Sequence, residues 1–134
     1  MRTLEDYKDI VDIKVIGDIH RKTRKLLGKR VVHVNSTNQG GGVAEILNSL
    51  VPLMNDIGLS AGWRVLHGNP DFFNITKKFH NGLQGDPVHF TRNKERIYIQ
   101  TNIDFAAFTH LSHDCIIIHD PQPLPMIKFY KKAQ

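Results

Sequence analysis

The stretch that decides the fold is VVHVNSTNQGGGVAEIL, at residues 31–47. Its first five residues are rich in valine and predict a short buried strand. A polar loop with three consecutive glycines follows, and from Val43 to Ile57 the apolar residues recur at the spacing of one helix face. Pro52 lies inside that pattern and is expected to bend the helix without ending it. A strand, a glycine loop and a helix in direct succession indicate a parallel α/β unit.

The rest of the chain continues this alternation. We expect a strand over 61–67, a helix over 71–80, a helix over 91–112 in which residues 97–99 also fit a strand, a strand over 115–118, and a last helix beginning near Leu124. This order predicts an α/β fold, with a Rossmann-like parallel sheet covered by helices on both faces. We divide the chain into a basic N-terminal lead-in, residues 1–28, and one domain, residues 29–134, because 134 residues suit a single core.

Composition narrows the class of protein. Lys and Arg number 18 against 13 Asp and Glu, a formal charge of +5 that suits anionic ligands. The basic clusters at 20–25 and 128–132 are short and lie towards the two ends of the chain, so we interpret them as solvated helix faces and expect no nucleic-acid partner. No apolar run approaches the ~20 residues of a membrane span, so no membrane partner is expected. The single cysteine, Cys115, cannot form an internal disulfide; we expect a buried structural thiol and a cytoplasmic location.

The glycine loop is the first candidate site. Ligands of open parallel sheets gather at the carboxyl ends of the strands, and Asn35 ends the first strand. The glycines Gly40, Gly41 and Gly42 let a backbone approach a ligand closely, and the amides of the following helix attract anions. Glu45, in the first turn of that helix, adds a carboxylate that suits a polyhydroxylated ligand. The alternative is a tight turn that needs its glycines for geometry alone.

The second candidate site is HDPQP, at residues 119–123. His119 and Asp120 place an imidazole beside a carboxylate, which can bind sugar hydroxyls or share a proton, and Gln122 adds an amide. The alternative for Asp120 is that it caps the following helix. Residues 79–85 are expected to form a polar turn from which His80 and Gln84 can reach a cleft. The other histidines lack the spacing of metal ligands, so we expect neither a metal nor a cofactor.

Four segments together resemble a known family. HVNST at 33–37, GGGVAEIL at 40–47, FHNGLQG at 79–85 and HDPQP at 119–123 are similar to the N-terminal part of the trehalose glycosyltransferring synthases and trehalose phosphorylases, retaining glycosyltransferases of family 4. The resemblance implies a partial N-terminal lobe of a GT-B enzyme, which moves glucose between a nucleotide-glucose and glucose. It also implies that the glycine loop approaches the donor phosphates, and that His119 and Asp120 lie in the pocket of the acceptor sugar.

The resemblance also sets limits on the expected activity. In the family a second lobe carries the nucleotide site, and 134 residues are too few for it. We therefore expect this chain alone to be inactive, with glucose and a nucleotide-glucose as substrates of the full-length family. The alternative is a non-catalytic module that associates with copies of itself through an exposed sheet edge, giving a homo-oligomer.

Overall fold

The computed structural model of the chain describes residues 3–37 and 39–130. Its contacts divide them into two units, which are described separately. Unit 1 comprises residues 3–33, 39–63 and 113–117, and unit 2 comprises residues 34–37, 64–112 and 118–130. Asn38 of the glycine loop, and Lys131 and Lys132 of the C-terminal basic cluster, lie outside the described residues.

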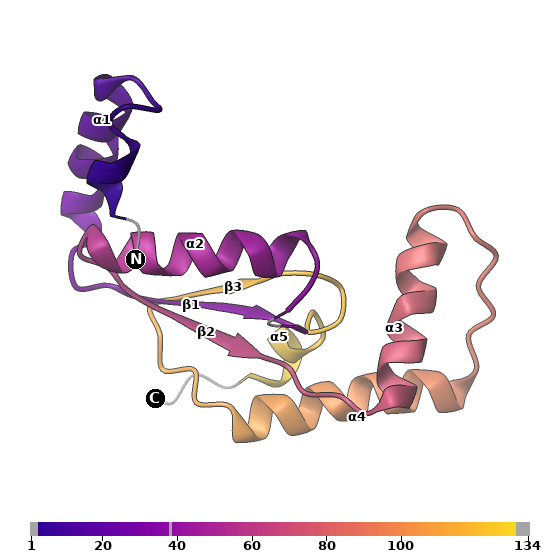
Figure 1. Cartoon of the computed structure of the whole chain (residues 1–134). Coiled ribbons are helices and arrows are strands. Elements are labelled where there is room, and N and C mark those ends of the chain that lie inside the picture. The colour runs from indigo at the N-terminus through magenta and orange to yellow at the C-terminus, as the bar shows by residue number, and fades with distance from the viewer. Residues whose placement is uncertain (1–2, 38, 131–134) are drawn as a thin grey trace. The chain divides into compact units, whose positions relative to one another are not determined.

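The sheet has three parallel strands (Figure 1). Strand β1 (Arg30–Asn35) lies between β2 (Ser60–Val65) and β3 (Cys115–Ile118). Every residue of β1 after Arg30 is buried. A central strand that is apolar and buried along its whole length is typical of a parallel α/β sheet. The Rossmann-like α/β class expected from residues 31–47 is thereby confirmed.

Unit 1 holds the N-terminal helices and α2. Two short 3-10 helices, η1 (Leu4–Tyr7) and η2 (Arg24–Leu26), lie on either side of helix α1 (Ile13–Thr23) in sequence. Helix α2 (Gly42–Asp56) buries Ala44 and Leu47 almost completely and continues through Pro52, as expected. Gly58, just after the helix, has a φ of +92°, which favours glycine and ends the helical path.

Unit 2 holds helices α3 (Pro70–Leu83), α4 (Arg92–Phe108) and α5 (Met126–Phe129). The Asn69 side chain caps α3 by accepting a hydrogen bond from the Phe72 amide at 2.8 Å. The expectation of a polar turn from residue 79 is wrong, because α3 continues through Leu83. Phe79 in that part of the helix packs on the rings of Phe90 and Tyr98, at centroid distances of 4.5 and 4.7 Å. This apolar packing outweighs the weak helix propensity of the glycine at position 82.

Two further expectations are settled by these elements. Residues 97–99 lie inside α4, so the strand alternative for them is excluded. Cys115 is exposed at the start of β3, and the expectation of a buried thiol is wrong. The run Cys115–Ile118 forms an outer strand of the sheet, so an apolar sequence alone did not ensure burial at its first residue.

Candidate functional site at the strand ends

The carboxyl ends of β1 and β3 lie side by side in unit 2. The His119 amide donates a hydrogen bond to the Val34 carbonyl at 2.8 Å, which continues the pairing of β1 with β3. On the other side, the Leu66 amide donates to the Asn35 carbonyl at 2.7 Å. The backbone of two predicted site residues, Asn35 and His119, is therefore brought together at one edge of the sheet.

Asn35 is fully buried, and its side chain acts on the start of the loop. Its Nδ2 group donates a hydrogen bond to the Thr37 carbonyl at 2.6 Å. A short side-chain bond to a backbone carbonyl two residues ahead fixes the direction in which the chain leaves the strand. Asn35 thus sets the backbone path at the start of the predicted glycine loop.

The segment 119–123 turns sharply after β3. Asp120 has a φ of +70°, in the left-handed region, and is the one described residue other than glycine with a positive φ. Aspartate tolerates this conformation better than most residues, and such backbones are frequent at functional sites. The Asp120 side chain is exposed, and α5 begins after Pro125, so Asp120 is not its N-cap. The capping alternative is wrong, and the carboxylate is accessible to a ligand.

Helix α4 holds this turn in place through two side chains. The Tyr98 hydroxyl donates a hydrogen bond to the Pro121 carbonyl. One turn later Asn102 donates from Nδ2 to the Gln122 carbonyl at 3.0 Å, and to the Tyr98 carbonyl at 3.0 Å. Burial raises the pKa of the Tyr98 phenol, so it stays protonated and remains a donor at neutral pH. The turn is therefore fixed by hydrogen bonds from α4 to its backbone.

Tyr98 and Asn102 were missed by the sequence analysis. The signal was present, because the two polar residues are spaced i, i+4 on a helix whose other inward positions are apolar. Asn102 is 0% exposed, and a fully buried amide in a helix is placed there to bond something outside its own turn. The sequence does not reveal which segment that is.

Two side-chain oxygens near the contact between α4 and the turn accept no hydrogen bond from the part of the chain that the structure describes. Asn102 Oδ1 and Gln122 Oε1 are buried and have no hydrogen-bond partner among the described residues. Buried carbonyl oxygens are costly to leave unpaired, and hydroxyl groups are donors that satisfy them. Both oxygens are enclosed, so the exposed Asp120 carboxylate is the acceptor at this turn that a polyol can reach.

The three glycines of the loop lie in unit 1. Gly40 and Gly41 have φ values of +70° and +85°, so the backbone itself requires glycine at both positions. Gly42 begins α2 with an ordinary φ, and a Cβ atom added there meets no atom within 4 Å. Geometry alone thus explains two of the three glycines, and the third leaves open space beside the helix N-terminus. Glu45 lies exposed in the first turn, as expected.

His80 and Gln84 lie at the C-terminal end of α3. Their side chains contact each other, with 3.2 Å between His80 Nε2 and Gln84 Nε2, and both residues are exposed. Within unit 2, this end of α3 points away from α5 and from the segment after β3 (Figure 1). The structure therefore does not bring them to His119 and Asp120.

The described ranges, 3–37 and 39–130, contain neither a metal-binding cluster nor a membrane-spanning helix. No three histidine, cysteine or acidic side chains gather closely enough there to hold a metal ion. No helix in those ranges is both long and apolar enough to cross a membrane.

The class of protein follows from the fold and from this edge of the sheet. A parallel α/β sheet with polar segments after β1 and β3 is a partial Rossmann-like lobe, of the kind found in GT-B enzymes. Comparison with known families identifies it further. The family described as "Trehalose synthase, N-terminal domain" matches residues 33–134, and the chain belongs to it. The resemblance read from the four sequence segments is thereby confirmed.

Curated relatives agree with this assignment. A trehalose synthase from Pyrococcus horikoshii is 48% identical over 133 residues, which cover 98% of this chain and 32% of the relative. A trehalose synthase from Rubrobacter xylanophilus is 40% identical over 131 residues, 96% of this chain and 32% of the relative. A trehalose phosphorylase from Pleurotus pulmonarius is 32% identical over 144 residues, 98% of this chain and 20% of the relative. The chain thus spans about a third of the length of the trehalose synthases that it matches.

Proposed function

We propose that this chain forms the acceptor-sugar side of a retaining glucosyltransferase of the trehalose synthase type. The enzyme transfers glucose between a nucleotide-glucose and glucose. The observation that carries the proposal is the turn at residues 119–123, which α4 holds by its backbone next to the end of β1. The names of the relatives support glucose as the sugar in this proposal, since the trehalose synthases are the most similar of the relatives described above.

The residues of the turn at 119–123 bind the acceptor sugar in this proposal. His119 and Asp120 orient the acceptor hydroxyl, because an imidazole and a carboxylate both accept hydrogen bonds from it. Gln122 adds a side-chain amide to the same turn. Fixing the acceptor in this way lowers the entropic part of the barrier.

The glycine loop has the complementary role. Charge develops on the diphosphate as it leaves the donor sugar, and backbone amides at the start of α2 stabilise that charge. A Cβ atom added at any of the three glycines meets no atom within 4 Å, so a ligand can approach the backbone along the loop. Glu45 binds a donor or acceptor hydroxyl. His80 and Gln84 belong to the proposal only through the family resemblance.

We further propose that these 134 residues do not transfer glucose on their own. In the GT-B arrangement the nucleotide is held by a second lobe, and this chain spans about a third of its trehalose synthase relatives. A cytoplasmic location is part of the proposal, because one cysteine needs no oxidising compartment.

Calorimetric titration of the chain tests the sugar site. Glucose, trehalose and a nucleotide-glucose are titrated separately into the wild type, Asp120→Asn and Asp86→Asn. Asp86 is a matched control, because it is an exposed carboxylate in the loop after α3. We expect glucose to bind, and Asp120→Asn to weaken it about tenfold, the usual loss for a hydrogen bond to a charged group. No binding of any of the three at millimolar concentration, or equal loss in both variants, rejects the site.

One observation favours a second function. Strand β3 is an outer strand, and Cys115 at its start is exposed. An outer strand with free backbone groups is a template for pairing with another chain, so a self-associating module is the alternative. Light scattering decides it, because a monomer at high protein concentration excludes association through this edge.

A further inference from the structure

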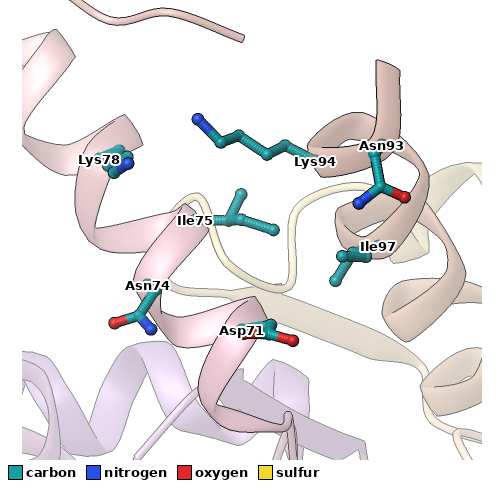
Figure 2. A pocket seen from close by; sticks show the side chains of 7 residues that line it. All are labelled: Asp71, Asn74, Ile75, Lys78, Asn93, Lys94 and Ile97. Atoms are coloured by element: carbon teal, nitrogen blue, oxygen red, sulfur yellow. The ribbon is translucent and has the colours of Figure 1, made fainter. Parts of the chain in front are cut away.

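A groove of about 260 Å³ lies between α3 and α4, within unit 2. Its walls are one face of α3, at the spacing i, i+3, i+4 and i+7, and the first two turns of α4 (Figure 2). Its volume suits a ligand of the size of one sugar ring with a substituent. The lining residues are Asp71, Asn74, Ile75, Lys78, Asn93, Lys94 and Ile97.

Two lysines give the groove its charge. Lys94 extends from α4 into the space between the two helices, and its ammonium donates a hydrogen bond to the His89 carbonyl at 3.1 Å (Figure 2). Lys78 projects from α3, two helical turns beyond Asp71. Within the described ranges, neither lysine has a carboxylate at ion-pair distance. Two cations without counter-charge, one from each wall, make this part of the groove an anion site.

The start of α4 has a charge pattern that helix stability does not explain. Arg92 and Lys94 lie in its first turn, where the helix dipole disfavours cations. Glu95 is the one acidic residue there. Residues that depart from such local rules are expected most often at functional sites. An anion bound in the groove would compensate for this placement by neutralising the lysines.

The remaining residues of the groove indicate which kind of molecule bears the anionic group. Ile75 is 5% exposed and Ile97 is half-buried, so together they provide an apolar floor. Asn93 offers the nitrogen of its amide, whose oxygen accepts a hydrogen bond from Arg96 at 3.1 Å, and Asp71 offers a carboxylate at the end away from the lysines. A pyranose has an apolar face for such a floor and hydroxyls for an amide and a carboxylate. We propose that the groove binds a phosphorylated monosaccharide, with its phosphate between Lys78 and Lys94.

The test is a titration of the chain, labelled with nitrogen-15, with glucose 6-phosphate, inorganic phosphate and glucose. Amide shifts locate each ligand, and calorimetry gives its affinity. The variants are Lys78→Gln, Lys94→Gln and the matched control Lys77→Gln. Lys77 is an exposed neighbour of Lys78 on the same helix, but it does not line the groove. Far-UV circular dichroism checks that each variant is folded.

We expect glucose 6-phosphate to bind saturably, with shifts at Asn93 and Lys94. Each groove variant weakens this binding about tenfold, while Lys77→Gln changes it less than about twofold. Inorganic phosphate binds more weakly than the sugar phosphate. Binding equal for both rejects the sugar part of the proposal. Absence of saturation at ~10 mM glucose 6-phosphate, equal weakening by Lys77→Gln, or shifts confined to residues 119–123 rejects the groove site. The last outcome would assign the ligand to the strand-end site of the proposed function.

Discussion

Replacing Tyr98 with phenylalanine removes one hydroxyl group and leaves the ring in place. That hydroxyl donates to the Pro121 carbonyl, in the turn that carries His119 and Asp120. The ring keeps its contacts with Phe72 and Phe79, at centroid distances of 6.2 and 4.7 Å, so the packing is unchanged. We expect a loss of about 1–2 kcal/mol in the free energy of unfolding, because a partly buried carbonyl loses its donor.

Urea unfolding measures that loss directly, from the midpoint at an unchanged slope. For a domain of this size, 1–2 kcal/mol corresponds to a melting temperature roughly 3–8 °C lower. A second measurement reports on the turn itself. The amide signals of Asp120 and Gln122 shift in Tyr98→Phe, because the backbone between them has lost an anchor.

Tyr130→Phe is the matched control. The Tyr130 hydroxyl donates to the Leu111 carbonyl, so this variant also removes one phenol bond to a backbone carbonyl. We expect a similar loss of stability but no shift at Asp120. The reasoning is refuted if Tyr98→Phe loses less than about 0.3 kcal/mol. It is equally refuted if Tyr130→Phe moves the signals of the turn as much as Tyr98→Phe does.

Three further predictions concern unit 1. Gly41→Ala loses about 1–2 kcal/mol of unfolding free energy, because Gly41 has a φ of +85°. Gly42→Ala is neutral or stabilising in the same urea assay, because an added Cβ atom meets no neighbour there. Equal losses in the two variants contradict this explanation. The backbone N–H of Arg30 donates to Asp114 at 2.8 Å and holds the pKa of that carboxyl below its usual value. The Asp114 carboxylate therefore stabilises the fold above about pH 4, and this stabilisation is lost as the pH falls through the lowered pKa. We expect the unfolding free energy of Asp114→Asn to depend less on pH in the acid range. An unchanged acid profile contradicts this role of Asp114. Because Cys115 is exposed, we expect it to react with a thiol reagent as fast in the folded protein as in urea. A reaction rate that falls as the protein concentration rises supports association through β3.

Residues 31–47 predicted the centre of the fold because three independent patterns agree there. A valine-rich run, consecutive glycines and a helical period each favour the same order of elements. The strands at β2 and β3 and the long α2 with Pro52 inside it were predicted for similar reasons. Local patterns suffice where each segment's own propensity matches its place in the structure.

The errors arose where partners distant in sequence decide the structure. Glycine and polar residues near position 80 favoured a turn, but Phe79 packs on Phe90 and Tyr98 and keeps the segment helical. Cys115 begins an apolar run, yet it lies on an outer strand, and only the strand order reveals that. The anchoring of the turn by Tyr98 and Asn102 requires α4 and residues 121–122 to meet, which no single segment predicts.

The position of β1 between β2 and β3 has a consequence for the way the protein is made. During synthesis β1 can pair with β2 once residue 65 has left the ribosome, because among the described residues α2 is the one element between them. The other edge of β1 stays unpaired until β3 has been synthesised as far as Ile118. At 5–20 residues per second, about 3–10 seconds pass while the valines of β1 have one unpaired edge. The nascent chain is therefore most prone to aggregation during the translation of α3 and α4, and slow codons in that interval prolong the exposure.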